Sequence, residues 1–175
     1  IDLDCFYAQV EMKRLGIPPE QPFAVQQWGG LLAVNYPARA CGVKRLGDTP
    51  ASASEKCRRA RKEMLFCHVR LEPWADATPQ HLSYLDSLYQ ATTSTRVPVR
   101  SDGQVSLEPY REAGAKILEK MIDSSRIGSA VISKTSVDEM YVDMTDLVVS
   151  GDDGVDLSLP PPTLEQSGTF VWVGH

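Results

Sequence analysis

Two short β-prone runs near the start of the chain constrain its fold most strongly. Residues 23–27 and 31–34 are rich in apolar side chains and flank the turn Trp28-Gly29-Gly30. Runs of this length around a glycine-containing turn predict a β-hairpin. Two later runs, residues 130–132 and 140–144, predict two further strands with a short connection between them. The chain must therefore form strands in at least two separate places.

Amphipathic segments surround the first hairpin. The first four residues alternate apolar and acidic, as an edge strand does, and residues 6–12 follow with helical spacing. Asp4 is placed to cap that helix, and Gly16 is placed to end it. Residues 54–66 predict a basic amphipathic helix.

Loops and two more helices complete the pattern. The segment 36–50 predicts irregular structure, as do the polar segment 92–103 and the acidic, proline-containing stretch beyond Ser150. Thr78-Pro79 begins a third helix, and a fourth runs from about Ser106 to Ser124. Helices and strands alternate without the rhythm of a doubly wound sheet, which predicts an α+β fold.

The charge of the chain is unevenly distributed. Its 175 residues carry 18 basic and 23 acidic side chains, and the net charge of -5 taken alone argues against a nucleic-acid-binding protein. Residues 39–70, however, hold nine cations against three anions, so this segment has a net charge of +6 and the remainder has -11. The positive segment is therefore able to attract phosphate groups.

Several classes of protein are disfavoured by composition. No apolar run approaches the roughly 20 residues of a membrane-spanning helix. The four cysteines show no CxxC spacing, so we expect reduced thiols, and of the adjacent Cys67 and His68 we expect one in the core and one at the surface. Residue 1 is isoleucine and no secretory signal is present, so we expect a piece of a longer protein.

Carboxylates at two distant places form the first candidate site. Asp2 lies in the first predicted strand, and Asp138-Glu139 lie in the connection between two later strands. Such residues are able to meet at one sheet edge and supply the oxygen ligands that Mg²⁺ requires. Two Mg²⁺ ions held by about three carboxylates can clamp both oxygens of a phosphoryl transfer. Spacing alone favours the alternative of a strand-edge charge and a solvated turn.

Cations gather in the second candidate site, residues 33–45. Tyr36 and Arg39 together present a phenolic hydroxyl and a guanidinium fork, which suit a polyphosphate. Lys44 and Arg45 add positive charge after the glycine at position 42. Taken alone, a surface loop with three cations is again the favoured interpretation.

Three segments, in order along the chain, resemble the motifs of one enzyme family. Residues 1–11, IDLDCFYAQVE, are similar to the opening motif of the Y-family, or translesion, DNA polymerases. Residues 35–39 with 42–45 look like the fingers motif, and residues 136–143, SVDEMYVD, look like the second catalytic motif. Within that family the chain most resembles the eta branch, and Gln27 is one of the residues that fit this choice. The resemblance covers about residues 1–70 and 103–149.

The resemblance implies a role for each matching residue. Asp2, Asp138 and Glu139 would be the catalytic carboxylates and, with the backbone carbonyl of Leu3, the ligands of two Mg²⁺ ions, for which Mn²⁺ is an alternative. The residues that would bind the incoming nucleotide are Cys5, Phe6, Tyr7, Tyr36, Arg39 and Arg45. Tyr7 would also exclude ribonucleotides by colliding with the 2′-hydroxyl. The residues that would contact the templating base pair are Gln27 and Leu32.

The resemblance also implies a division of the chain. Residues 1–22 would begin the polymerase palm, residues 23–72 would form a small fingers subdomain, and residues 103–149 would continue the palm with the second catalytic motif. Residues 73–102 would be an insertion, and residues 150–175 an acidic loop or truncated end. The palm would be partial, with helices packed on a mixed or antiparallel sheet.

The implied activity is the addition of deoxynucleotides to a primer 3′-hydroxyl opposite damaged template. Its partners would be primer–template DNA, a deoxynucleoside triphosphate and a sliding clamp recruited through a missing C-terminal region, with no membrane partner. Likeness to the eukaryotic eta branch implies the nucleus. Two alternatives stay open: another Y-family branch, and a truncated, non-catalytic product. As an isolated polypeptide we expect little or no processive activity, and poor folding because palm strands would lack partners.

Overall fold

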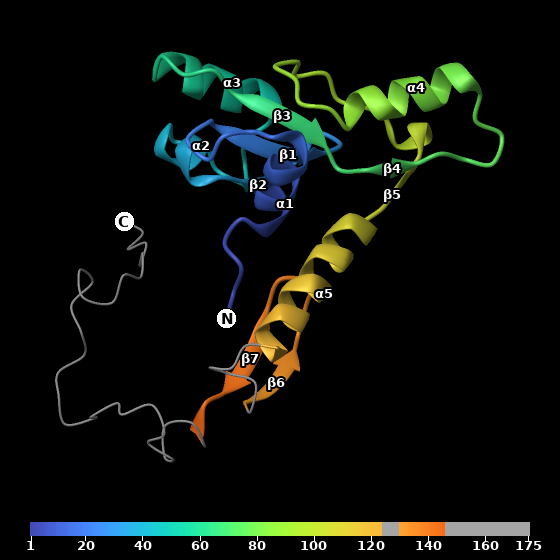
Figure 1. Cartoon of the computed structure of the whole chain (residues 1–175). Coiled ribbons are helices and arrows are strands. Elements are labelled where there is room, and N and C mark those ends of the chain that lie inside the picture. The colour runs from blue at the N-terminus through green and yellow to red at the C-terminus, as the bar shows by residue number, and fades with distance from the viewer. Residues whose placement is uncertain (124–129, 146–175) are drawn as a thin grey trace.

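The computed structural model describes residues 1–123 and 130–145, and it confirms the predicted α+β class. Figure 1 shows a small sheet with helices on both faces, and a long helix, α5, that extends away from this sheet beside a two-stranded hairpin. The predicted acidic loop beyond Ser150 lies outside the described residues. None of the helices in the described part of the chain is long and apolar enough to cross a membrane.

The predicted first hairpin is the centre of the sheet. Strand β1 (Phe23–Gln27) pairs antiparallel with β2 (Gly30–Val34) and parallel with β3 (Leu65–His68), so the strand order is β2-β1-β3. Trp28 takes the left-handed conformation at the turn, with φ 53°. The sheet is mixed because one of these pairings is antiparallel and the other is parallel. The parallel partner β3 lies more than thirty residues further along the chain.

Helices cover both faces of this sheet, which explains why consecutive residues of β1 and β3 are buried, including the polar Gln26 and His68. Helix α1 (Phe6–Leu15) lies on one face, where its side chains pack against Phe23 and Val25. Helices α2 (Tyr36–Ala40) and α3 (Pro50–Arg59) lie on the other, packed around Ala24 and Phe66. Because neighbouring strand residues point to opposite faces, the core has two clusters.

The ends of the first helices differ from the prediction. Cys5, not Asp4, is the N-cap of α1, in a left-handed conformation with φ 40°, whereas Gly16 ends that helix as predicted. The short helix α2 stands where irregular structure was expected. It forms because the side chain of Asn35 accepts a hydrogen bond from the backbone N–H of Ala38.

The predicted basic helix over residues 54–66 is wrong at both ends. Helix α3 begins four residues earlier, because Thr49 and Ser52 form a capping box and Pro50 occupies the first turn. It ends at Arg59, and Arg61 turns the chain with φ 56°. Residues 65–68 then become strand β3, because pairing with β1 buries them more fully than a helix surface would.

Cys67 and His68 are both buried, so the expectation of one surface residue is wrong. The Nε2 atom of His68 accepts a hydrogen bond from the backbone N–H of Trp28 at 2.9 Å, and its Nδ1 lies 2.6 Å from the carbonyl oxygen of Val69. Burial lowers the pKa of His68, so the ring is neutral near pH 7. The buried imidazole thereby holds the hairpin turn onto β3. All four cysteines are free thiols.

Residues 73–103 begin and end at one place, and between these ends Thr92 pairs with Phe66 of β3 and the Tyr89 ring contacts Arg14 of α1. Strand β4 (Leu71–Glu72) pairs antiparallel with β5 (Gln104–Val105), and between them lie α4 (Pro79–Leu88) and the short 3₁₀ helix η1 (Arg100–Asp102). Thr78 caps α4 as predicted. The β4–β5 ladder therefore closes this segment at its base.

The last described elements form one unit. Helix α5 (Glu108–Ile122) is followed by strands β6 (Val131–Lys134) and β7 (Met140–Asp143), which pair antiparallel as predicted. Figure 1 shows this hairpin beside the far half of α5. Gly114 of α5 is buried against the connection between β6 and β7. A Cβ atom there would lie only 2.3 Å from the carbonyl oxygen of Val137.

Candidate functional site

The chain start pairs with the second hairpin and brings the predicted carboxylates together. The backbone N–H of Leu3 donates to the carbonyl oxygen of Asp138 at 2.9 Å, and that of Met140 donates to the carbonyl of Ile1 at 3.0 Å. Asp2 and Glu139 are therefore opposite each other in an isolated antiparallel bridge. Directly opposed residues place their side chains on the same face, about 5 Å apart at Cβ. The strand predicted for residues 1–4 is reduced to this bridge.

A cavity of about 280 Å³ opens beside these carboxylates. The predicted site residues that line it are Asp2, Leu3, Cys5, Phe6, Tyr7, Leu32, Arg39, Arg45, Asp138 and Glu139. Ala33, at the start of the candidate segment 33–45, also lines it, as does Asp4, which was predicted only as a helix cap. Gln27, at the end of β1, and Tyr36, in the first turn of α2, are not among the lining residues. Residues separated by up to 137 positions in the sequence thus surround one polar space.

Ser136 holds the turn that carries Asp138. Its hydroxyl donates to Asp138 Oδ1 at 2.8 Å and accepts hydrogen bonds from the backbone N–H groups of Asp138 at 3.3 Å and Glu139 at 3.0 Å. Ser136 was not identified from the sequence as the residue that positions this turn. A serine two positions before a carboxylate in a turn is the signal that identifies it.

The cationic wall of the cavity is fixed from behind by Asn35. Its Oδ1 accepts from the N–H groups of Phe23 at 2.9 Å and Ala38 at 3.1 Å, and its Nδ2 donates to the carbonyl of Gln21 at 2.8 Å. This buried amide joins the start of β1 to the start of α2. Sequence reasoning missed this role because two of its three bonding partners, Phe23 and Gln21, lie more than ten residues away.

Arg39 is anchored by one edge of its guanidinium group. Its Nε donates to the carbonyl of Val34 at 2.9 Å, and its guanidinium carbon lies 5.1 Å from the centre of the Tyr36 ring. The terminal nitrogens, which form the fork that matches phosphate oxygens, are not used by the bond to Val34. Burial raises the pKa of Tyr36, with the Asp4 carboxylate adding to the effect, so this phenol is protonated and able to donate.

Tyr7 lines the cavity and is affected by charges of both signs there. Its ring centre is 4.2 Å from that of Tyr110, at an angle of 60°, so the ring is braced from α5. Burial raises the pKa of Tyr7, the charge of Asp138 raises it further, and Arg45 opposes both. Burial likewise raises the pKa of Cys5 against the effect of Arg39, so Cys5 is a neutral thiol and a poor nucleophile.

The carboxylate set suits Mg²⁺ by its chemistry. Three carboxylates from two segments face one polar cavity, and hard dications take such oxygen ligands. Over residues 1–123 and 130–145, no three Asp, Glu, His or Cys side chains already converge at metal-binding positions. The backbone geometry thus brings the ligand-bearing residues together, and binding requires rotation of the side chains of exposed Asp2 and Glu139 and half-buried Asp138.

Comparison with known proteins gives consistent matches. The model of the impB/mucB/samB family matches residues 1–158. N-acetyltransferase eso1 of Schizosaccharomyces pombe is 34% identical over 83% of this chain and 14% of its own length. DNA polymerase eta of Saccharomyces cerevisiae is 32% identical over 82% of this chain and 21% of its own length. DNA polymerase iota of Homo sapiens is 30% identical over 85% of this chain and 14% of its own length. The chain thus spans at most about a fifth of these relatives.

Proposed function

Because the chain belongs to the impB/mucB/samB family of Y-family DNA polymerases, we propose that it forms the nucleotide-transfer site of a translesion polymerase of the eta type. The reaction is attack of a primer 3′-hydroxyl on the α-phosphate of a deoxynucleoside triphosphate, opposite a damaged template base. The observation that carries this proposal is one cavity lined both by the carboxylate residues Asp2, Asp138 and Glu139, here called the acidic wall, and by Arg39 and Arg45, here called the basic wall.

The acidic wall is the proposed metal site. Asp2, Asp138 and Glu139, with the carbonyl of Leu3, would hold two Mg²⁺ ions, or Mn²⁺ in their place. When bound, these ions supply Lewis acidity that lowers the pKa of the attacking hydroxyl and neutralises charge on the leaving pyrophosphate. The hydroxyl of Ser136 donates a hydrogen bond to Asp138 Oδ1 and so restrains this carboxylate at the cavity. The carboxylates thus act by position, and no side-chain nucleophile takes part.

The basic wall is the proposed triphosphate site. Arg39 presents its guanidinium fork and Tyr36 its phenolic hydroxyl to the β- and γ-phosphates. Backbone N–H groups of residues 5–7, at the start of α1, add donors to the same anion. Arg45 lies over the incoming base, and Leu32, in β2, meets the base pair. Gln27 is proposed to contact the base pair from the end of β1, outside the cavity lining.

The wider assignments follow from the family. We propose primer–template DNA and a deoxynucleoside triphosphate as substrates, and a sliding clamp bound by a region outside residues 1–175. We also propose DNA-damage tolerance as the process and the nucleus as its location. Residues 1–22 and 103–149 are proposed as palm and residues 23–72 as fingers, with residues 73–102 inserted between them. Similarity to the iota polymerase keeps another branch as the second candidate.

Primer extension tests the proposed function. The full-length protein is incubated with a primed template, deoxynucleotides and Mg²⁺, on undamaged DNA and on DNA with one lesion. We expect extension that stops when the metal is chelated. A full-length protein that folds and binds primed DNA but extends neither template would contradict the proposal and favour the non-catalytic alternative. The pattern of bases inserted opposite each template base separates the eta from the iota branch.

Tyr7 gives a prediction about sugar selection. Replacing Tyr7 with alanine removes the ring that Tyr110 supports and opens space beneath the nucleotide sugar. We expect the preference for deoxy- over ribonucleotides to fall at least about tenfold, since steric exclusion of one small group is worth about 1–3 kcal/mol. Single-nucleotide insertion kinetics with both sugars measure the ratio. Tyr7→Phe keeps the ring and should keep the preference, and an unchanged ratio in Tyr7→Ala would remove Tyr7 from this role.

A further inference from the structure

The loop that carries Arg45 joins α2 to α3 and is exposed at its tip. Gly42 and Gly47, near its two ends, have left-handed φ values of 84° and 102°, and Leu46 is 86% exposed. Within the described residues, the side chain of Arg45 makes no hydrogen bond or ion pair. The position of this guanidinium over the cavity therefore depends on what fixes the loop backbone.

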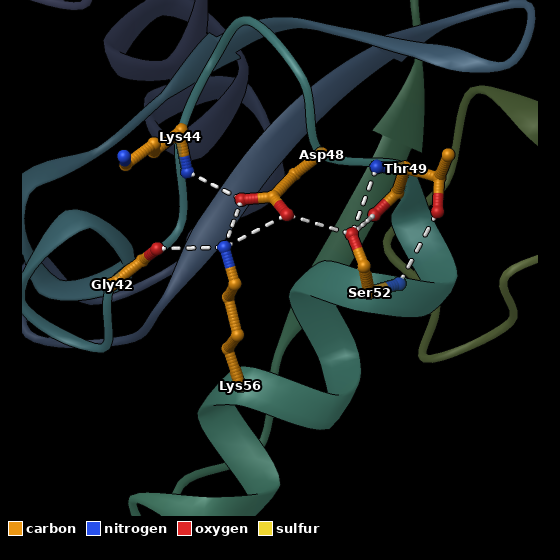
Figure 2. Close-up of polar contacts among 6 residues, drawn as sticks. All are labelled: Gly42, Lys44, Asp48, Thr49, Ser52 and Lys56. Carbon is orange, nitrogen blue, oxygen red and sulfur yellow. Dashed lines mark hydrogen bonds and ion pairs between the residues drawn. The ribbon is translucent and has the colours of Figure 1, made fainter.

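One nearly buried carboxylate fixes it. Asp48 is only 9% exposed, and both of its oxygens are used (Figure 2). Oδ2 accepts a hydrogen bond from the backbone N–H of Lys44 at 2.7 Å, and Oδ1 accepts from the hydroxyl of Ser52 at 2.8 Å. The first bond is made by the residue next to Arg45, and the second is made by the first turn of α3. Asp48 thus ties the loop to the helix.

Lys56 closes the same loop from the other side. Its Nζ lies 2.8 Å and 2.7 Å from the two oxygens of Asp48 and donates to the carbonyl of Gly42 at 3.0 Å. Figure 2 shows the ammonium between Gly42 and Asp48, with Lys56 reaching up from α3. A single cation therefore joins residues 42 and 48, the two ends of the segment in which Arg45 lies.

The charge state of Asp48 agrees with this geometry. Burial raises the pKa of Asp48, but the hydrogen bonds from Lys56, Lys44 and Ser52 and the charge of Lys56 outweigh it, so the pKa is lowered. The carboxylate is therefore ionised at neutral pH. A partly buried ion pair is weak evidence for stability, because desolvation offsets much of its attraction. Its clearer effect is to restrict the loop to one conformation.

We propose that the Asp48–Lys56 ion pair is a positioning device that holds the 42–48 loop so that Arg45 stays over the incoming nucleotide. This inference rests on the proposed function, because it assigns Asp48 to nucleotide binding through Arg45. Asp48 touches no substrate itself. Loss of the pair frees the loop, so that each nucleotide must order Arg45 before it binds, and affinity falls without a change in the chemical step.

The experiment compares variants of the full-length protein in single-nucleotide insertion. Asp48→Asn keeps the size of the side chain but loses the charge, and Lys56→Met removes the ammonium and keeps the stem. We expect each to raise the KM for the deoxynucleotide about tenfold with kcat within about twofold. The matched control is Glu55→Gln, also on α3, which loses ion pairs with Arg58 and Arg59 but none with the loop. It should leave the KM unchanged.

Arg45 distinguishes positioning from a general loss of structure. In an Arg45→Ala background, Asp48→Asn should raise the KM by less than about twofold, because nothing remains for the loop to position. An equal tenfold rise in both backgrounds, or an unchanged KM in both Asp48→Asn and Lys56→Met, would overturn the inference. If the wild-type protein extends primers and both variants keep an unchanged KM, as Glu55→Gln does, only this inference is overturned. If the wild-type protein extends no primers, both the proposed function and this inference are overturned.

Discussion

Replacing Asp138 with asparagine in the full-length protein is expected to lower kcat for nucleotide addition about a thousandfold. The asparagine keeps the size of the side chain and an oxygen able to accept from Ser136, so the turn should keep its shape. What it loses is the negative charge proposed to hold a metal. Metal stabilisation is worth several kcal/mol, and about 4 kcal/mol corresponds to three powers of ten in rate.

Kinetics and DNA binding are both measured for this variant. Affinity for primed DNA should stay within about twofold, because one carboxylate is a small part of a polymerase–DNA interface. Glu139→Gln should behave in the same way. Asp143→Asn is the matched control, since Asp143 lies at the end of β7 and outside the cavity. Near-normal turnover of Asp138→Asn at saturating Mg²⁺ would show that the metal assignment is wrong.

The second large effect is expected at Gly114, which no motif of the sequence identifies. Alanine has the higher helix propensity, by about 1 kcal/mol, so propensity alone predicts that Gly114→Ala stabilises α5. The structure predicts the opposite, because the added Cβ would lie 2.3 Å from the carbonyl oxygen of Val137. Helix α5 and the β6–β7 connection must then move apart. Asp138 is the next residue after Val137, so the carboxylate moves with it.

We expect Gly114→Ala to lower kcat at least about tenfold and to lower the free energy of unfolding by about 1–3 kcal/mol, as overpacking does. Insertion kinetics and thermal unfolding measure the two effects. Gly29→Ala is the control, because a Cβ at position 29 meets no atom within 4 Å. If Gly114→Ala were as stable and active as the wild type, the close contact with Val137 would not position the site.

Local patterns predicted the elements whose formation depends on their own residues. The first hairpin, the start of α4 at Thr78 and the β6–β7 pair have the apolar spacing or the capping residue within the segment itself. The bridge between Asp2 and Glu139 also brings together carboxylates for which spacing alone favoured a strand-edge charge and a solvated turn. The first hairpin, the start of α4 and the β6–β7 pair share a signal that lies within about ten residues, whereas Asp2 and Glu139 are 137 positions apart.

Elements fixed by distant partners could not be predicted in this way. Helix α2 depends on Asn35, whose amide is held by Gln21 and Phe23, and residues 65–68 form a strand only because β1 is beside them. Gly114 matters through Val137, which is 23 positions away. The roles of individual site residues came from the family resemblance. They stay predictions, which the variants above are designed to test.

The β4–β5 ladder has a consequence for how chains of this kind can change in length. Leu71 pairs with Val105 and Glu72 with Gln104, so the segment between them begins and ends at one point on the surface. Doubling the length of such a closed loop costs only about 0.6 kcal/mol of additional closure entropy. Insertions in the exposed stretch just after β4 change the outline of the molecule and leave in place the bridge of Thr92 to Phe66 in β3 and the contact of Tyr89 with Arg14 in α1. This junction is therefore where evolution, or a designer who wishes to attach a reporter, can add sequence at least cost to the site.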